Sequence, residues 1–350
     1  MSALRKISIA MAGVVAFVAT TGFVPGASVP SWQLSPTGVT ARFRGLAPVS
    51  DKVAWVAGSE GTILRTVDGG QSWASVGPAG TAELQFRDIE ASDAQHAVAL
   101  TIGEGEDSRL YKTSDGGATW TETFRNTDPL AFYDCITFLD QRHGLALSDP
   151  VDGKFRILAT TDGGKSWKVQ PSDGMPAALT GEFAFAASGT CLVSSGGRAY
   201  FATGGGASAR VFTSSNFGRS WTVTDTPIPS GLSAGIFSLA FRDPGHGIAV
   251  GGDYNVPAAA PDGSATTRDG GRTWTVSRTV PGEYRSGAAW ADGKTALAVG
   301  PTGSDISRDG GKSWTGFDTG SFDAVECVGH GACWASGEQG RVAVLKWGRH

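Results

Sequence analysis

An eight-residue pattern, Thr/Ser-x-Asp-Gly-Gly-x-Ser/Thr-Trp, recurs along the chain and limits the possible folds more than any other feature. Five copies match it, at residues 66–73, 113–120, 160–167, 267–274 and 307–314. A sixth, at residues 214–221, is degenerate and has Asn216 in place of the aspartate. The six tryptophans are 47, 47, 54, 53 and 40 residues apart. Repeats of this length are typical of solenoids and β-propellers.

Each residue type in this pattern, called a box below, has a role in a tight turn. The aspartate accepts hydrogen bonds from backbone N–H groups, the glycines supply positive φ, and the hydroxyls tie the loop down. The tryptophan begins the next strand and packs beneath the turn. We therefore interpret the acidic or amide residue of each box as structural: Asp68, Asp115, Asp162, Asn216, Asp269 and Asp309.

A longer strand-turn-strand unit precedes each box, and a seventh copy follows the last box. Each unit begins with an aromatic residue, and the seven starts are Phe43, Phe86, Tyr133, Phe183, Phe237, Tyr284 and Phe322. About 320 residues divided among seven units gives about 46 per unit, which fits a four-stranded blade. The sequence predicts an all-β fold: a single seven-bladed β-propeller of four-stranded antiparallel blades over residues 28–350.

The seventh unit lacks a box, and the N-terminal region supplies the missing part. Ser31 and Trp32 repeat the end of a box whose beginning is absent from the last unit. We therefore expect residues 31–36 to pair with the strand at residues 341–346 and to complete the last blade. Such closure leaves only short, protected sheet edges.

The composition agrees with many short strands joined by turns. Glycine accounts for 51 of the 350 residues, 40% of the residues are hydrophobic and only 18% are charged. These values exclude a disordered chain and a coiled coil, and they argue against a mainly helical protein. The formal net charge is −4 without a basic tract, which argues against nucleic acid as a partner.

The N-terminus has the pattern of a secretory signal peptide. Arg5 and Lys6 precede an apolar run over residues 7–18, and small residues follow. We expect residues 1–27 to be the signal, with cleavage between residues 22 and 28; an uncleaved anchor is the alternative. The processed protein is then expected in the periplasm, or in the thylakoid lumen of a photosynthetic host, or secreted, with no membrane-spanning segment.

The four cysteines allow three pairings. Cys327 and Cys333 flank a tight hairpin and face each other across it, so an exported protein is predicted to join them in a disulfide. Cys135 and Cys191 fall in neighbouring blades and different strands, and we expect them to be buried thiols.

The best candidate for a binding surface is the mouth of the central channel. The innermost strand of each blade lines the channel, so the residue after each starting aromatic is informative. These residues are Arg44, Arg87, Asp134, Ala184, Ser238, Arg285 and Asp323. The loops between second and third strands share that face, and they add Glu60, Glu104, Asp149, Asp253 and Glu338, with Arg198, Tyr200, Tyr254 and Asn255 in two longer loops. A rim of charges that pair only with one another is the alternative interpretation.

No metal or cofactor is expected. His96, His143, His246 and His330 each fall in the turn between the first two strands of a unit. Equivalent turns of different blades are too far apart to share one ion. We therefore predict a structural role in the turn for each histidine.

The boxes resemble the Asp-box (BNR) repeats of β-propeller proteins. Residues 61–73, preceded by Trp55-Val-Ala-Gly, resemble more specifically the photosystem II stability/assembly factor family. That resemblance implies a lumenal or periplasmic seven-bladed propeller that binds photosystem II assembly intermediates as a scaffold. It implies a protein partner and no catalysis, and we expect a monomer.

Asp-box propellers also include sialidases and other glycosidases, so a glycan-binding or glycan-cleaving propeller is the alternative. The stretch Phe155-Arg156-Ile157-Leu158 is similar to a sialidase motif, but it directly precedes a box and has leucine where the motif has proline. We interpret it as an ordinary blade strand. An exposed aromatic platform beside a close carboxylate pair would favour the glycan alternative.

Overall fold

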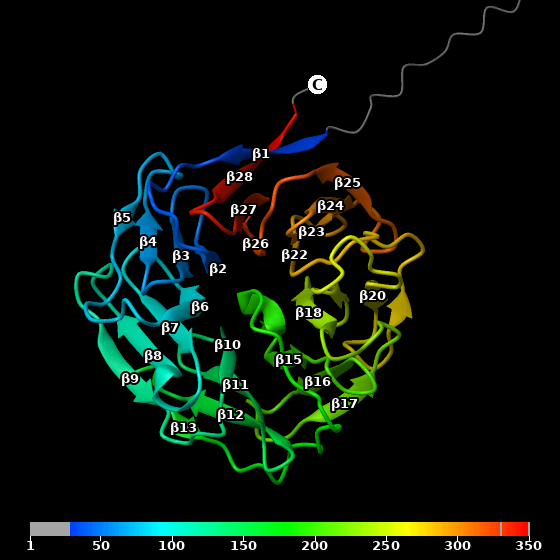
Figure 1. The fold of residues 1–350 in the computed structure, drawn as a ribbon, viewed down its shortest axis with the longest axis horizontal. Helices are drawn as coiled ribbons and strands as arrows, with labels where there is room; N and C mark the ends of the chain where they lie inside the picture. Colours follow the sequence, from blue (N-terminus) through cyan, green and yellow to red (C-terminus); the bar gives the residue numbers. More distant parts are fainter. Residues whose placement is uncertain (1–28, 330, 349–350) are drawn as a thin grey trace, which may run out of the picture.

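The computed structural model describes residues 29–329 and 331–348, and these residues form a ring of seven four-stranded sheets (Figure 1). The predicted seven-bladed propeller is therefore confirmed. The expected signal peptide and His330 lie outside the described residues. Among the described residues, no helix is both long enough and apolar enough to cross a membrane.

The first three blades follow the chain from the inner to the outer strand. Blade 1 comprises β2 (Phe43–Pro48), β3 (Ala54–Gly58), β4 (Ile63–Thr66) and β5 (Ala74–Ser75). Blade 2 comprises β6 (Gln85–Ala91), β7 (Ala97–Ile102), β8 (Arg109–Thr113) and β9 (Thr121–Arg125), with the 3-10 turn η1 (Gly105–Asp107) between β7 and β8. Blade 3 comprises β10 (Tyr133–Phe138), β11 (Gly144–Val151), β12 (Lys154–Thr160) and β13 (Lys168–Val169).

The next three blades repeat this order. Blade 4 comprises β14 (Leu192–Ser195), β15 (Arg198–Ala202), β16 (Arg210–Ser214) and β17 (Thr222–Asp225), with the 3-10 turn η2 (Gly189–Cys191) directly before β14. Blade 5 comprises β18 (Ala234–Phe241), β19 (Gly247–Asp253), β20 (Ser264–Thr267) and β21 (Thr275–Val276). Blade 6 comprises β22 (Gly287–Trp290), β23 (Ala296–Gly300), β24 (Gly303–Ser307) and β25 (Thr315–Asp318).

Blade 7 joins the two ends of the chain, as the sequence predicted. It comprises β26 (Ala324–Val328), β27 (Ala332–Ser336), β28 (Val342–Trp347) and β1 (Pro30–Leu34), which is the outermost strand. β1 runs antiparallel to β28 with Trp32 opposite Leu345. Trp32 is half-buried, and its Nε1 donates to Ser304 Oγ of blade 6 at 3.0 Å. Ring closure therefore depends on a strand from the opposite end of the chain.

Each box forms the turn between the third and fourth strands of its blade. In blade 1, Thr66 Oγ1 donates to Asp68 Oδ1 at 2.8 Å and accepts from Gly70 N at 2.9 Å. Ser72 donates from its backbone N to Asp68 Oδ1 at 3.0 Å. The bonds from Ser72 and Thr66 lower the pKa of Asp68 to about 2. The degenerate box keeps this turn, because Asn216 Oδ1 accepts from Ser220 N at 3.0 Å.

The core is a set of layers between neighbouring blades rather than one centre. Trp55 of blade 1 and Phe86 of blade 2 belong to one such layer, and both side chains are almost fully buried. Box tryptophans pack at the outer part of these layers. Trp73, for example, lies edge-on against Trp334 with ring centroids 6.1 Å apart. Each blade therefore needs both neighbours to bury its two faces.

Blade 4 departs from the predicted pattern. Its first strand begins at Leu192, not near Phe183, so the prediction that Ala184 lies in a channel-lining strand was wrong. Arg198 and Tyr200 were expected in a loop but belong to the second strand, β15. The glycine pair 196–197, both with positive φ, makes the turn between β14 and β15 and shifts the hairpin by several residues.

Both cysteine pairs form disulfides. Cys327 lies directly opposite Cys333 in the β26–β27 hairpin, and the bond predicted there is confirmed. The expectation of free thiols at Cys135 and Cys191 was wrong, because these two residues are also bonded. The physical reason is the late start of β14, which places Cys191 in η2 rather than in a strand and brings its Cα to 6.1 Å from that of Cys135.

Candidate functional site

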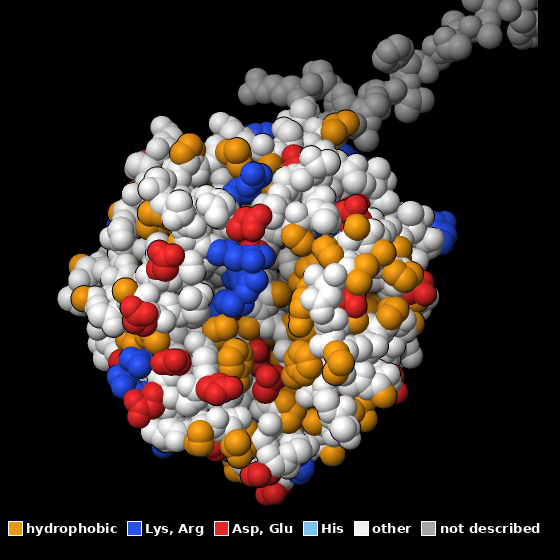
Figure 2. All heavy atoms as spheres, viewed as in Figure 1, with side chains coloured by type: hydrophobic (Ala, Val, Ile, Leu, Met, Phe, Trp, Pro, Cys, Tyr) orange, Lys and Arg blue, Asp and Glu red, His pale blue; other side chains and the backbone are white. Residues whose placement is uncertain are grey.

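The face that carries the loops between second and third strands is the candidate surface. Figure 2 shows this face, with Lys and Arg side chains gathered near the middle of the ring beside acidic ones. Hydrophobic side chains gather mainly over blades 5 and 6. The mouth is therefore divided into a charged part and an apolar part.

The structure places most of the predicted residues on this face, although not all in the expected elements. Arg44, Arg87, Asp134 and Ser238 lie in the first strands β2, β6, β10 and β18. Asp323 directly precedes β26, and Arg285 lies two residues before β22. The loops after second strands contain Glu60, Glu104, Tyr254, Asn255 and Glu338. Asp149 and Asp253 lie within the second strands β11 and β19.

Asp323 is the centre of an ion-pair group between blades 7 and 1. Arg42 binds it through two bonds, Nε to Oδ2 at 2.7 Å and Nη2 to Oδ1 at 2.6 Å. Arg44 lies farther away, with Nε 3.7 Å from Asp323 Oδ1, and this Nε is buried without a hydrogen-bond partner among the described residues. Burial lowers the pKa of Arg44. Sequence reasoning missed Arg42, although its spacing of two from Arg44 in an extended segment puts both on one side.

Arg285 is not available at the mouth. It is 3% exposed, and its Nε donates to Asp305 Oδ2 at 2.6 Å. Its Nη1 donates to the carbonyl of Tyr284 and to Thr302 Oγ1 at 3.0 and 2.9 Å. This arginine therefore holds blade 6 together, so the alternative of internally paired charges is correct for this position.

Residues 183–191, called the plug below, cross the channel before blade 4 begins. Figure 1 shows the short helical turn at the end of the plug, in green, in the middle of the ring. Arg87 Nη1 donates to the Ala186 carbonyl at 2.8 Å, and Ser188 Oγ donates to the Ser286 carbonyl at 2.8 Å. Thr190 Oγ1 and Ser238 Oγ share a bond of 2.7 Å. With the bond from Cys191 to Cys135, the plug is tied to blades 2, 3, 5 and 6.

An aromatic cluster anchors the plug on blades 5 and 6. Phe185 stacks on Phe237 with ring centroids 3.8 Å apart, and Tyr284 packs edge-on against Phe237. Tyr254 is 48% exposed and lies beside this cluster, with its ring 6.2 Å from that of Phe185. Leu232, at 86% exposed, also belongs to the segment that leads into blade 5. The apolar part of the mouth therefore rests on the plug.

A carboxyl pair at the mouth is covered by the plug. Asp134 is 2% exposed, and its Oδ2 has no hydrogen-bond partner among the described residues. Burial and then the Asp149 carboxyl raise the pKa of Asp134 well above its usual value, and burial raises the pKa of Asp149 to about 7. Asp149 Oδ1 accepts from Ala184 N of the plug at 2.8 Å. The pair therefore faces the plug.

Three further carboxyls inside the channel were missed by sequence reasoning. Burial is the main cause that raises the pKa values of Asp88, Glu90 and Glu326, and for Glu90 the value is about 7. Asp88 accepts from Ile89 N and Ile136 N at 2.8 and 2.7 Å. The alternation of charged and apolar residues from Asp88 to Ala91 in β6 was the available signal.

The turn histidines and residues 155–158 have structural roles. His96, His143 and His246 each place Nδ1 at 2.9, 2.8 and 2.9 Å from the aspartate three residues earlier, which confirms the predicted turn role for these three. In the part of the chain that the structure describes, no cluster of histidine, cysteine or acidic residues could hold a metal ion. Residues 155–158 lie within β12, as predicted.

The fold and mouth together define a class, the seven-bladed β-propellers with four-stranded blades. No protein-family model matches the chain, and no curated protein sequence matches it. Among solved structures, it is similar to YCF48 bound to D1 peptide, with a TM-score of 0.65 and 15% identity over 92% of this chain and 100% of that one.

Two more solved structures share the architecture. YCF48 from Cyanidioschyzon merolae is similar with a TM-score of 0.64 and 16% identity, over 91% of this chain and 98% of that one. The WD40 β-propeller domain of Doa1 is similar with a TM-score of 0.58 and 14% identity, over 91% of this chain and 98% of that one. At such identities the likeness shows the fold alone.

Proposed function

We propose that this protein is an exported, non-catalytic propeller that binds a segment of a partner protein at the channel mouth and acts as a scaffold or assembly factor. The observation that carries this proposal is Arg44. Its guanidinium lies at the mouth, where Asp323 Oδ1 is 3.7 Å from Nε, and among the described residues this buried Nε has no hydrogen-bond partner. The Arg44 side chain is 20% exposed, and a carbonyl or carboxylate of a bound segment accepts from its accessible N–H groups.

The plug makes the mouth a surface site rather than a channel. Residues 183–191 occupy the channel. A ligand therefore binds to the charged part of the mouth beside Arg44 and to the apolar part beside Tyr254. An extended peptide suits this arrangement because its carbonyl groups can meet Arg44 while its side chains cover Leu232 and Tyr254. The similar structure of YCF48 with a D1 peptide supports a peptide ligand for this chain.

Export is part of the proposal. The predicted signal at residues 1–27 directs the chain to the periplasm, or to the thylakoid lumen of a photosynthetic host. Two disulfides support an oxidising compartment. Cell fractionation and N-terminal sequencing of the processed protein test this part, and a cytoplasmic protein that keeps Met1 would contradict it.

The binding proposal is tested in two stages. The tagged protein is first purified from its native cell envelope and its partner identified, and peptides from that partner are then titrated by calorimetry. Arg44→Ala should weaken binding by about tenfold to a hundredfold, since a hydrogen bond to a charged group contributes about 1.5–3 kcal/mol. Arg142→Ala is the control, because Arg142 is exposed in a turn between first and second strands, on the opposite face.

Two outcomes would contradict the proposal. Equal binding by the parent and Arg44→Ala would remove Arg44 from the site. Hydrolysis of glycosides by the purified chain would instead favour the glycosidase alternative.

A further inference from the structure

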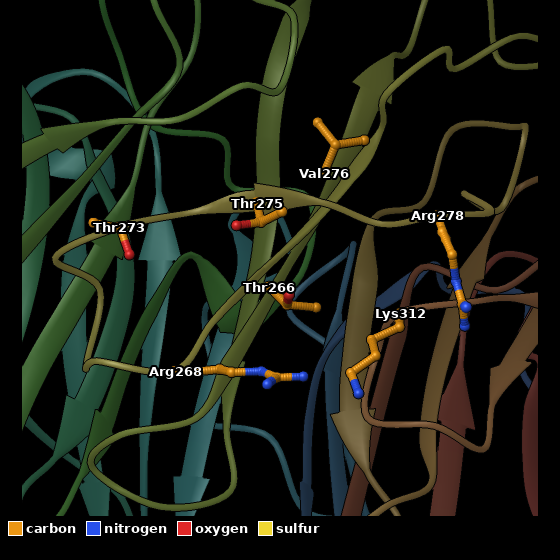
Figure 3. A pocket seen from close by; sticks show the side chains of 7 residues that line it. All are labelled: Thr266, Arg268, Thr273, Thr275, Val276, Arg278 and Lys312. Atoms are coloured by element: carbon orange, nitrogen blue, oxygen red, sulfur yellow. The ribbon is translucent and has the colours of Figure 1, made fainter.

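A concave site lies on β20 and β21 of blade 5 and on the box of blade 6, away from the mouth. Figure 3 shows this groove, whose cavity volume is about 500 Å³. Three cationic side chains and three threonines line it: Arg268, Arg278, Lys312, Thr266, Thr273 and Thr275. Thr266 lies opposite Thr275 in the β20–β21 pair, and Arg268 follows Thr266 by two residues. The groove is therefore built on the backbone of blade 5, and blade 6 contributes Lys312.

The charge of this groove is a local property of two blades. Each box has two variable positions, before the aspartate and after the second glycine. Blades 5 and 6 carry only cations there: Arg268, Arg272, Arg308 and Lys312. Blades 1 to 4 carry mostly neutral residues: Val67, Gln71, Ser114, Ala118, Thr161, Lys165, Ser215 and Arg219. The turn itself does not require positive charge, since the other boxes form it without one.

Within the described residues, two of the three cations in the groove have no counter-ion. The side chains of Arg268 and Lys312 make no hydrogen bond or ion pair with any residue that the structure describes. Arg278 is partly neutralised, because its Nη2 lies 3.2 Å from Asp309 Oδ2. The nearby Asp269 is occupied by its own box, where Thr273 donates to it from N at 3.0 Å and from Oγ1 at 2.6 Å. About two positive charges therefore remain uncompensated in one concave space.

We propose that this groove binds the phosphate monoester group of a small hydroxylated molecule. A phosphate monoester carries about two negative charges near pH 7 and three acceptor oxygens, which match two unpaired cations and neighbouring hydroxyl donors. Arg268 offers a planar fork and Lys312 a point charge, while threonine hydroxyls bind the phosphate or the polyol. The volume of about 500 Å³ lies within the usual range of small-ligand sites.

The shape favours a small molecule over a membrane surface. The groove is concave, and Val276 is the one apolar residue that lines it. Membrane-bound proteins insert aromatic or large aliphatic side chains beside their cations, and the lining of this groove offers none.

The test is calorimetry on residues 28–350 at low ionic strength with three probes: glucose 6-phosphate, inorganic phosphate and glucose. The double variant Arg268→Gln, Lys312→Gln removes the unpaired charges. Lys165→Gln is the matched control, because Lys165 occupies the position of Lys312 in the box of blade 3. Lys165, Arg268 and Lys312 are exposed, so both variants should keep the parent's melting temperature. Measuring that temperature checks that the ring is intact.

We expect glucose 6-phosphate to bind the parent and Lys165→Gln equally, the double variant to bind at least about tenfold more weakly, and glucose not to bind. Inorganic phosphate that binds as tightly as glucose 6-phosphate would support the dianion site and identify free phosphate as its occupant. Equal binding by the double variant, or no saturable binding of either phosphate, would overturn the proposal. Co-sedimentation with phosphatidate vesicles without binding of the soluble phosphates would also overturn it, in favour of a membrane surface. None of these outcomes bears on Arg44 at the mouth.

Discussion

The two disulfides connect different kinds of structure: one lies within blade 7, and the other links blade 3 to the plug that precedes blade 4. Cys327 and Cys333 are cross-strand neighbours in one hairpin of blade 7, six residues apart in sequence. Cys135 and Cys191 are 56 residues apart and join the first strand of blade 3 to the plug that leads into blade 4. The first bond reinforces contacts that neighbouring residues make anyway, whereas the second fixes a segment with no strand partner along most of its length.

The comparison shows how the ring accommodates irregularity. Blade 7 keeps four regular strands even though its strands come from both chain ends. Blade 4 shortens its first strand to four residues and uses the preceding segment to fill the channel. Because the plug lacks a ladder of backbone bonds, side-chain contacts and a covalent bond hold it in place.

Replacing the cross-blade disulfide should have the largest effect. In the chain-entropy account, a bond across 56 residues stabilises the fold by about 4 kcal/mol. Cys135→Ala with Cys191→Ala should lower the free energy of unfolding by about that amount, measured by denaturant unfolding without reductant. Hydrogen exchange at Ala184 and Gly189 should accelerate more than exchange in β27. Unchanged exchange in the plug would show that its hydrogen bonds suffice without the disulfide.

Removing the tryptophan that closes blade 7 should have the next largest effect. Trp32 packs against Phe317 and Phe322, with centroid distances of 6.1 and 5.4 Å, and donates to Ser304. Because Trp32 is half-buried, Trp32→Ala should cost about 2–3 kcal/mol, less than the about 3–5 of a fully buried ring. Thermal unfolding is the measurement, and exposed Lys346→Ala on the paired strand is the control. If Trp32→Ala melts like the parent, β1 does not stabilise the ring.

Replacing the hairpin disulfide should cost less than either change. A bond across six residues contributes about 2 kcal/mol in the same account. Cys327→Ala with Cys333→Ala should therefore destabilise the protein about half as much as the cross-blade pair, measured in the same denaturant series. A larger loss than for the cross-blade pair would reverse our comparison of the two blades.

The smallest expected effect concerns pH and the carboxyl beneath the plug. Burial raises the pKa of Asp149 from 3.8 to about 7, so the folded state holds a proton that the unfolded state releases. Its contribution is therefore full below pH 4 and lost as pH rises through about 7. The melting temperature should fall by a few degrees between pH 5 and pH 8, and by less in Asp149→Asn. A melting temperature that rises over this range in the parent alone would contradict the assignment.

The sequence predicted the regular parts of this protein well. The blade count, the completion of blade 7 by residues near Trp32 and the Cys327–Cys333 bond were all anticipated, because each follows from a repeat or from neighbours in one hairpin. Blade 4 was misread because the aromatic residue Phe183 imitates the start of a strand. At the mouth, the sequence identified Arg44 and Asp323 as candidates but missed Arg42, which binds Asp323 from 281 positions away.

The sequence by itself determined the turns, since the bonds that make a box join residues at most four apart, such as Asp68 and Ser72. Six such turns at nearly regular spacing, with strands between them, leave a ring of blades as the way to bury both faces of each sheet. Only the tertiary structure decided which charges pair, which segment fills the channel and which cations remain without a partner. Those outcomes depend on groups that meet after the ring has closed, as Arg42 meets Asp323 and Cys135 meets Cys191. Local sequence patterns do not specify these contacts, because the contacts depend on where every other blade places its inner strand.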